Sequence, residues 1–337
     1  MKILENVPIA SLTTMRLGGP AHFVIEIEKP EDAPEAYNFA REKNLPVFVL
    51  GGGANTLGHD EGFAGVLIMN KILGIKIDMQ DDGSALVHAM GGEVWDDLVA
   101  ATCERGLTGI EALSKIPGTV GAAPVQNIGA YGQDVSQVLE SIEVFDTADS
   151  TFKTLAAADL GFAYRKSILN SSESGRYFVL AATFKLRVGE MARPFYKSLE
   201  KYIADHNETD FAPAAIRRMV SAIRADKLPD PEFIPSAGSF FKNVYVDDAR
   251  ADELLAQGFP VYRGHDGNKI NSGWLIEQAG LSGKVLHGFR VNEKAALVLI
   301  NESATSYADL AAARQEIVDI VFEKFGFKLE QEPVEIL

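Results

Sequence analysis

An uncharged segment in the middle of the chain constrains the fold more than any other feature. Residues 115–134 read KIPGTVGAAPVQNIGAYGQD, and no charged side chain lies between the terminal Lys115 and Asp134, although 23% of the chain is charged. Seven of the eighteen residues between them are Gly or Ala. Glycine leaves the main chain open to close approach by a ligand or by another segment. The segment therefore predicts either a binding surface made of backbone or a glycine-rich packing corner.

A short helix is predicted to begin at Pro117, because proline suits the first helical position. Gly118, Gly121 and Ala122 would then expose amides at the helix N-terminus, which is a favourable place for phosphate. Further along, Gln126 and Asn127 offer amide donors and acceptors of the kind that bind the edge of a heteroaromatic ring.

A second glycine-rich loop, GGGANT at 51–56, follows a predicted buried strand. It is not GxxxxGK[ST], because no Lys-Ser or Lys-Thr ends it, and it is not GxGxxG, because Thr56 replaces the third glycine. Successive backbone N–H groups in such a turn can still form an anion-binding nest, and a plain tight turn is an equal alternative. Two glycine-rich surfaces without a basic residue favour a dinucleotide whose diphosphate is bound by backbone dipoles.

Length and charge limit the function classes. A chain of 337 residues predicts two or three domains, and a net charge of -15 argues against nucleic-acid or anionic-membrane partners. The single cysteine, Cys103, and six histidines without HxxxH or HExxH spacing leave no predicted metal site. The N-terminus lacks a signal-peptide pattern, and no apolar run reaches membrane-spanning length. We expect a soluble, cytoplasmic protein.

Hydrophobic periodicity predicts an α+β fold with mixed helices and strands. Strands are expected at 22–28, 45–50, 65–69, 74–80, 85–90, 139–146, 151–155, 176–188, 239–244 and 295–302. Helices are expected at 32–43, 95–105, 194–206, 213–227, 249–258, 273–280 and 307–325. The prolines of LPDP at 228–231 cannot continue a helix, so they mark a domain boundary near residue 228.

Several motifs together resemble one family. LGGGANTL, GIEALSKIPGTVGAAPVQNIGAYG, FAYRKSIL, KLPDP, AGSFFKN and GWLIEQAGL are similar to the UDP-N-acetylenolpyruvoylglucosamine reductases, flavoenzymes of peptidoglycan precursor synthesis. The resemblance covers essentially the whole chain in the same order. The GAYG element and the segment after it are similar to the type I form, in which a loop carrying a substrate-binding Tyr folds over the site.

The resemblance implies a two-domain FAD-binding module of the vanillyl-alcohol-oxidase/PCMH type and a C-terminal α+β substrate-binding domain. The expected boundaries are 1–70 and 71–228 for the FAD module, 229–327 for the substrate domain, and 328–337 for a tail that returns to the active site. It further implies non-covalent FAD, with NADPH as the hydride donor. The implied cofactor-binding residues are Gly51, Gly52, Gly53, Ala54, Asn55, Thr56, Pro117, Gly118, Gly121, Ala122, Gln126, Asn127, Gly129 and Ala130.

Three residues match the family's catalytic positions. Arg165 would hold the substrate carboxylate, Ser239 would deliver a proton, and Glu332 would stabilise the enol or acid form of the intermediate. The tail departs from the family pattern, because Pro333 follows Glu332 and Glu335 stands where an apolar residue is expected. Glu330 is therefore the alternative tail carboxylate. Without the resemblance, a solvated Arg, a turn Ser and a surface Glu are the ordinary interpretations.

The resemblance also implies a substrate path for a UDP-sugar enolpyruvyl ether. Tyr131, Tyr196, Arg224, Lys227 and Asn243 would line it, with Tyr196 covering the diphosphate. Arg217 and Arg218, on the same predicted helix, are interpreted as surface arginines whose stems lie along apolar neighbours.

Two alternatives remain open. One is an FAD-dependent oxidase of the same architecture that acts on an alcohol or sugar, although no His or Cys lies in a recognisable flavin attachment motif. The other is a catalytically inactive nucleotide-binding or regulatory protein, against which Arg165 and Ser239 argue.

Overall fold

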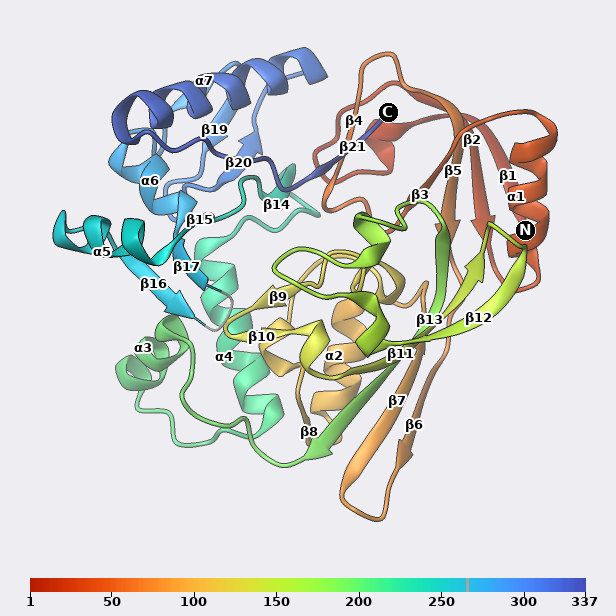
Figure 1. Ribbon diagram of the computed structural model, residues 1–337, viewed down its shortest axis with the longest axis horizontal. Coiled ribbons are helices and arrows are strands. Elements are labelled where there is room, and N and C mark those ends of the chain that lie inside the picture. Colours follow the sequence, from red (N-terminus) through yellow and green to blue (C-terminus); the bar gives the residue numbers. More distant parts are fainter. Residues whose placement is uncertain (265–266) are drawn as a thin grey trace. The chain divides into compact units, whose positions relative to one another are not determined.

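The computed structural model describes residues 1–264 and 267–337 (Figure 1). The chain forms two compact units. The larger unit contains Met1–Asn6, Ala21–Gly52 and Ala64–Ala225, and the smaller unit contains Val7–Pro20, Gly53–Phe63 and Asp226–Leu337. The chain passes to the smaller unit for the last time close to LPDP, whereas the finer boundaries expected near residues 70 and 327 stay predictions.

The first sheet has the strand order β1-β2-β5-β3. Its strands are β1 (Lys2–Pro8), β2 (Pro20–Ile27), β5 (Phe63–Asn70) and β3 (Val47–Leu50), and α1 (Asp32–Glu42) follows β2 in the chain. β3 and β5 are parallel, with Val47 opposite Val66. The apolar residues of β2, β5 and α1 bury one common core, which includes Ile25, Ala36 and Ile68. The predicted helix at 32–43 and strand at 65–69 are confirmed.

The second sheet of the larger unit has the order β12-β11-β13-β7-β6, and β8 also pairs with β13. Its strands are β6 (Ile75–Met79), β7 (Ser84–Met90), β8 (Leu107–Thr108), β11 (Leu139–Asp146), β12 (Thr151–Ala156) and β13 (Tyr177–Val188). Neighbouring strands are antiparallel. Helix α2 (Trp95–Cys103) packs on this sheet, and Trp95 makes an edge-to-face contact with Phe184 of β13.

The last two elements of the larger unit along the chain are helices. They are α3 (Lys197–His206) and α4 (Pro213–Lys227), whose apolar faces pack together through Leu199, Ile216 and Met219. The bounds of α4 agree with the predicted helix. Helix α3 begins three residues later than expected, after a cis peptide bond between Arg193 and Pro194.

The smaller unit contains two further sheets, ordered β14-β20-β19-β18 and β15-β17-β16. Its elements are β14 (Ser236–Ser239), β15 (Val244–Val246), α5 (Asp248–Ala256), β16 (Val261–Gly264), β17 (Gly267–Ile270), α6 (Ser272–Gln278), β18 (Val285–Leu286), β19 (Phe289–Val291), β20 (Val298–Asn301) and α7 (Tyr307–Phe325). One core joins α7 to β19 and β20 through Ile317, Val291 and Leu299. A last pair joins β21 (Val334–Ile336) in parallel to β4 (Thr56–Gly58), as Figure 1 shows near the C-terminus.

One strand prediction is wrong. Residues 239–244 were expected to form a single strand, but β14 ends at Ser239 and β15 begins at Val244. Gly238 has a φ of +67°, which interrupts the extended backbone just before Ser239. The chain therefore bends at this point and passes from one sheet to another.

Two further observations concern the described residues as a whole. None of the helices found in 1–264 and 267–337 is long and apolar enough to cross a membrane. Within the same residues, His, Cys, Asp and Glu side chains form no group of three arranged to hold a metal ion.

Candidate functional site

The two glycine-rich segments meet in the larger unit. A Cβ atom on Gly52 would lie 2.9 Å from the Cα of Gly118, and one on Gly51 would lie 2.9 Å from the Cβ of Ala122. Gly118 has a φ of +128°, and a Cβ there would project into open space. Bare main chain from both segments thus forms one continuous wall, and only glycine permits the contact at Gly51 and Gly52.

The start of the 115–134 segment differs from the prediction. A 3-10 helix spans Val120–Ala122 and does not begin at Pro117. The amide of Val120 donates to the carbonyl of Glu93 and that of Gly121 to Gly91, each at 2.9 Å. These amides are satisfied by protein carbonyls, so the predicted helix N-terminus for phosphate is not formed. The bare backbone of Gly118 remains as the open part of this wall.

The middle of the segment is braced by Asn127. Its side chain is buried, with its oxygen accepting from the amide of Ser136 at 3.0 Å and its nitrogen donating to the carbonyl of Ala163 at 3.3 Å. These bonds connect the glycine-rich segment to the FAYRKS sequence. Asn127 therefore fixes the glycine-rich segment to its neighbours Ser136 and Ala163. Its contact with a cofactor ring stays a prediction. Gln126 is half-buried beside it.

Arg165 lies against the same segment. Its Nη2 donates to the carbonyl of Gly129 at 3.1 Å, and its guanidinium carbon lies 5.1 Å from the centre of the Tyr164 ring. Arg165 has a φ of +52°, in a tight turn in which Ala163 and Lys166 exchange backbone hydrogen bonds. A predicted catalytic cation and a predicted flavin-binding segment are thus brought together within one unit.

Tyr131, Tyr196 and Arg224 form a second group in the larger unit. Tyr131 follows strand β9 (Gly129–Ala130), which pairs with β10 (Gln133–Asp134). The rings of Tyr131 and Tyr196 meet edge to face, with centroids 5.9 Å apart. Desolvation by burial raises the pKa of Tyr131 and lowers that of Arg224, while the hydrogen bond and the charge attraction between them oppose both shifts. The Arg224 guanidinium stays charged near neutral pH despite this lowering, because the ordinary pKa of arginine is above about 12.

Arg217 is not the surface arginine that the sequence suggested. Its guanidinium donates to both carboxylate oxygens of Asp96 in α2, with Nη2 2.9 Å from Oδ2. Asp96 also accepts from the backbone amide of Lys115 at 2.7 Å and pairs with the Lys115 ammonium at 2.9 Å. This network, the Asp96 clamp, fixes helix α4 to the first residue of the 115–134 segment. Arg218, whose side chain is 60% exposed, donates to the Glu208 carboxylate at 2.8 Å.

In the smaller unit, the C-terminal tail pairs with the segment that follows Ser239. The amide of Glu332 donates to the carbonyl of Phe240 at 2.9 Å, and the amide of Lys242 donates to the carbonyl of Glu330 at 2.9 Å. Ser239 is the last residue of β14 and is the immediate neighbour of Phe240. Ser239 and Glu332, the two predicted catalytic residues of this unit, are therefore linked through one backbone hydrogen bond at Phe240.

The two candidate tail carboxylates differ in their surroundings. The Glu330 side chain is 76% exposed and lies 3.8 Å from the Lys242 ammonium, whereas Glu332 is half-buried. Asn243, a predicted substrate residue, accepts from the amide of Ser272 at 3.2 Å. Lys227 is exposed, and its carbonyl accepts from the Asn292 side chain.

The second half of the GGGANT loop lies in the smaller unit. Gly53 has a φ of +66°, and a Cβ there would lie 1.9 Å from the carbonyl oxygen of Leu12, so glycine is required. The carbonyl of Asn55 accepts from the amide of Val334 at 2.9 Å, and Thr56 starts the β4–β21 pair. Ala54 is half-buried between them in the chain. Residues 53–56 therefore connect this loop to the C-terminal tail.

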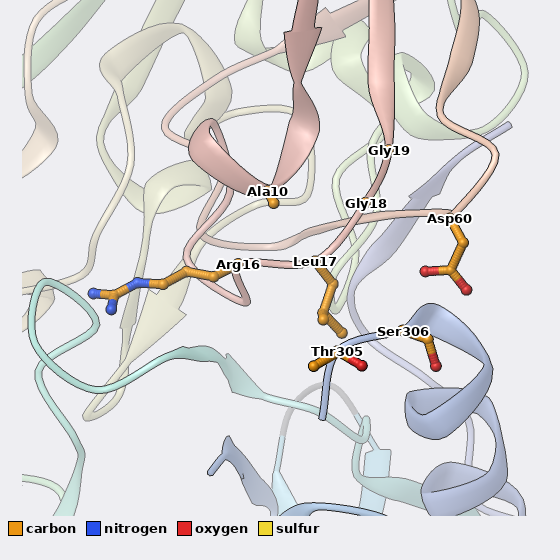
Figure 2. Close-up of a pocket in the computed structure, with 8 residues that line it drawn as sticks. All are labelled: Ala10, Arg16, Leu17, Gly18, Gly19, Asp60, Thr305 and Ser306. Carbon is orange, nitrogen blue, oxygen red and sulfur yellow. The ribbon is translucent and has the colours of Figure 1, made fainter. Parts of the chain in front are cut away.

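A hollow of about 500 Å³ in the smaller unit contains none of the predicted site residues. Figure 2 shows Arg16 and Asp60 at opposite ends of this hollow, with their side chains pointing apart. Arg16 donates to the carbonyl of Glu232, and Asp60 accepts from the amides of Tyr307 and Ala308 at the start of α7. Its two charged groups thus hold neighbouring backbone in place.

Comparison with known proteins identifies the families that the two parts of the chain resemble. Residues 21–156 match the FAD binding domain family, and residues 230–336 match the family of the UDP-N-acetylenolpyruvoylglucosamine reductase C-terminal domain. The UDP-N-acetylenolpyruvoylglucosamine reductase of Ralstonia nicotianae is 40% identical over the full length of both chains. That of Alcanivorax borkumensis is 38% identical over 98% of this chain and 95% of its own.

A solved structure has the same fold. The UDP-N-acetylenolpyruvylglucosamine reductase of Thermus caldophilus superposes with a TM-score of 0.65, covering 99% of this chain and 98% of that chain at 24% identity. The predicted fold class is therefore confirmed: an FAD-binding module followed by a C-terminal α+β domain.

Proposed function

Because this chain belongs to the UDP-N-acetylenolpyruvoylglucosamine reductase family, we propose that Arg165, Ser239 and Glu332 carry the chemistry of its reaction. The protein is an FAD-dependent oxidoreductase that reduces the enolpyruvyl ether of UDP-N-acetylglucosamine-enolpyruvate to UDP-N-acetylmuramate, in peptidoglycan precursor synthesis. The observation that carries this function is the full-length similarity to reductases of that name. It displaces both the oxidase and the inactive nucleotide-binding alternative.

The wall of bare main chain fits a flat, extended cofactor. Its open position at Gly118 and the absence of side chains at Gly51 and Gly52 allow close approach of a large ligand. We assign FAD to this wall, with Gly51, Gly52 and residues 117–130 holding it, and the cofactor contact expected for residues 53–56 stays a prediction. When bound, FAD supplies hydride transfer to the methylene carbon of the enolpyruvyl group.

Arg165 is assigned to the substrate carboxylate. A guanidinium stays charged and presents paired donors that match a carboxylate. Its bond to the Gly129 carbonyl fixes it beside the segment assigned to the flavin. Hydride addition at the methylene carbon leaves negative charge next to the carboxylate, so a fixed cation at this place stabilises the charge as it develops.

Ser239 is assigned to the proton transfer that completes the reduction. The carbon bearing the ether oxygen needs one proton, and the Ser239 hydroxyl is proposed to donate it. A serine is a weak acid, so this transfer requires a strongly basic carbanion as the acceptor. Glu332, whose backbone pairs with Phe240, is proposed to hydrogen-bond the enol or acid form of the same intermediate.

The substrate path is assigned to Tyr131, Tyr196, Arg224, Lys227 and Asn243, with Tyr196 covering the diphosphate. The contact of Arg224 with Tyr131, and of Tyr131 with Tyr196, supports a shared role for the first three. Tyr196 is 49% exposed at the start of α3, so its hydroxyl can reach a ligand. One half-buried cation, Arg224, and several hydroxyl or amide donors suit a diphosphate on an otherwise acidic protein.

We further propose that NADPH is the donor, that the enzyme acts as a cytoplasmic monomer, and that it supports cell shape and division through wall synthesis. The purified protein should be yellow, and denaturation should release unmodified FAD. NADPH should bleach it faster than NADH. A colourless protein that FAD cannot reconstitute would contradict the cofactor assignment.

Glu332 and Glu330 are distinguished by separate substitution with Gln. Glu332→Gln should lower turnover strongly, while Glu330→Gln should change it little, because the Glu330 side chain lies in solvent beside Lys242. Equal activity of the two variants would refute the tail assignment.

A further inference from the structure

The C-terminal tail is fixed by a carboxylate at a position where the family pattern predicted an apolar residue. Oε1 of Glu335 accepts from Nη1 of Arg314 at 2.8 Å and from Nε2 of Gln331 at 3.1 Å. Oε2 lies 3.1 Å from Nε2 of His59, and the Tyr307 hydroxyl also bonds this carboxylate. These five residues, His59, Tyr307, Arg314, Gln331 and Glu335, are called the tail anchor below.

The tail anchor joins three separate parts of the smaller unit. His59 follows β4, Tyr307 and Arg314 lie on α7, and Gln331 and Glu335 lie in the tail. The His59 ring stacks on Tyr307, with centroids 3.7 Å apart. Arg314 also donates to the side-chain oxygen of Gln331 at 2.6 Å. Side chains from α7, from the residue after β4 and from the tail itself therefore all contact the Glu335 carboxylate or its neighbours.

The surroundings of Glu335 differ from those of an ordinary surface ion pair. Its side chain is 21% exposed, and those of His59 and Arg314 are 23% and 27% exposed. Burial raises the pKa of Glu335, but the hydrogen bonds from Tyr307, Gln331, His59 and Arg314 outweigh it and lower the pKa to about 2. The Glu335 carboxylate is thus ionised near neutral pH and hydrogen-bonded to all four of these residues. Exposed ion pairs contribute little to the stability of the fold, whereas partly buried hydrogen-bond networks with several donors contribute more.

Glu332 is held between the tail anchor and the strand segment after Ser239. On one side, its own amide donates to Phe240. On the other side, the amide of Val334 donates to Asn55, and Glu335 pairs with Leu57 across β4. Pro333, between them, is buried and restricts the backbone, and its carbonyl accepts from Gln331. Little freedom remains for the backbone that carries Glu332.

We propose that Glu335 is a positioning residue for the reductase reaction: by tying the tail to His59, Tyr307 and Arg314, it holds Glu332 beside the strand that ends in Ser239. This inference rests on the role proposed above for Glu332. It predicts that loss of Glu335 acts through Glu332 and leaves the flavin half-reaction with NADPH intact.

The test compares Glu335→Gln and Glu335→Ala with Glu316→Gln in the full-length holoenzyme. Glu316 is a matched control, because it also pairs with a histidine, His287, at 3.0 Å, but its side chain is 42% exposed and it lies on α7 outside the tail anchor. Two quantities are measured: hydrogen exchange at the amides of Glu332 and Val334, and the rate at which the enolpyruvyl substrate reoxidises NADPH-reduced enzyme.

Glu335→Ala should speed exchange at both amides and slow substrate-driven reoxidation about tenfold, which is the scale of one lost charged hydrogen bond. Glu335→Gln should fall between Glu335→Ala and the unchanged protein, because its amide keeps the shape but loses the charge. Bleaching by NADPH should stay within about twofold in every variant, and Glu316→Gln should match the unchanged protein in all measurements.

A double-mutant cycle separates positioning from general destabilisation. If Glu335 acts through Glu332, adding Glu335→Ala to Glu332→Gln should slow reoxidation no further. A full additional slowing, or unchanged exchange of the tail amides in Glu335→Ala, would overturn the positioning role. If Glu332→Gln alone left reoxidation at the unchanged rate, the proposed role of Glu332 would fail, and the positioning role with it.

Discussion

The Arg165 guanidinium donates a 3.1 Å hydrogen bond to the Gly129 carbonyl, which lies in the uncharged segment assigned to FAD. The cation proposed for the substrate carboxylate therefore contacts the same segment that is proposed to hold the cofactor. The segment has no charged side chain between residues 116 and 133. A dry site strengthens such an interaction with developing negative charge.

Arg165→Lys should lower turnover about 100-fold, which is typical of removing a donor that stabilises developing charge. Lysine keeps the positive charge but cannot give the paired bond, so flavin binding and NADPH oxidation should remain. Steady-state rates and anaerobic bleaching measure the two effects. Arg218→Ala is the control, because the Arg218 side chain is 60% exposed and pairs with Glu208. Equal losses in the two variants would exclude the assigned role.

Gly52→Ala should weaken FAD binding. The added Cβ would lie 2.9 Å from the Cα of Gly118, which forces the two loops of the wall apart. Bound FAD per protein and the FAD dissociation constant report the effect. Gly175→Ala is the control: Gly175 has a φ of +79° with open space around it, so alanine there adds strain of about 1 kcal/mol without touching the wall. Unchanged FAD affinity in Gly52→Ala would argue against this wall as the cofactor site.

Asp96→Asn should destabilise the larger unit by about 2 kcal/mol at neutral pH, because it removes the charged acceptor of Arg217 and Lys115. Burial raises the pKa of Asp96, but the hydrogen bonds from Arg217 and Lys115 hold it well below its ordinary value. The stabilisation is therefore complete above the unfolded pKa of about 3.9 and is lost as the pH falls below it.

Denaturant unfolding between about pH 3 and pH 7 checks the Asp96 prediction. The difference between the unchanged protein and Asp96→Asn should shrink as the solution becomes more acidic. Glu208→Gln, which removes only the charged partner of the exposed Arg218, should have an effect below about 1 kcal/mol. A constant difference over the whole pH range would show that the Asp96 charge does not stabilise the fold.

Local patterns predicted most of the elements, whereas partners distant in sequence were not predictable. The helices at 213–227 and 307–325 agree with α4 and α7, since their apolar spacing is local information. Arg217 was taken for a surface residue because its partner, Asp96, lies 121 positions away. The strand expected at 239–244 fails for a similar reason, since a bulge at Gly238 inside β14 and the bridge of Phe241 to Gln331 in the distant tail decide the backbone there.

The site was predictable where bare backbone itself is the signal. The glycine loops at 51–56 and 115–134 indicated a shared surface, and Gly52 does contact Gly118. The helix start expected at Pro117 is wrong, because the amides of Val120 and Gly121 bond the carbonyls of Glu93 and Gly91 instead. Glu335 stood out only as a departure from the family pattern. Three of its four partners, His59, Tyr307 and Arg314, come from segments that the sequence alone does not bring together with the tail.

Ser239→Ala should keep the rate of flavin bleaching by NADPH and lose most of the substrate-driven reoxidation. The hydroxyl is assigned only to the proton transfer after hydride addition, so the earlier half-reaction does not need it. Ser282→Ala, which removes an exposed hydroxyl bonded to the Glu293 carbonyl, is the control. A parallel fall in both half-reactions would indicate that Ser239 has a structural role.

Anaerobic titration of the unchanged holoenzyme tests the central claim most directly. NADPH under nitrogen should bleach the flavin, and one equivalent of UDP-N-acetylglucosamine-enolpyruvate should then restore the full yellow absorbance and yield UDP-N-acetylmuramate. Bleached enzyme that stays colourless with this substrate, but recovers rapidly in oxygen alone, would contradict the reductase assignment.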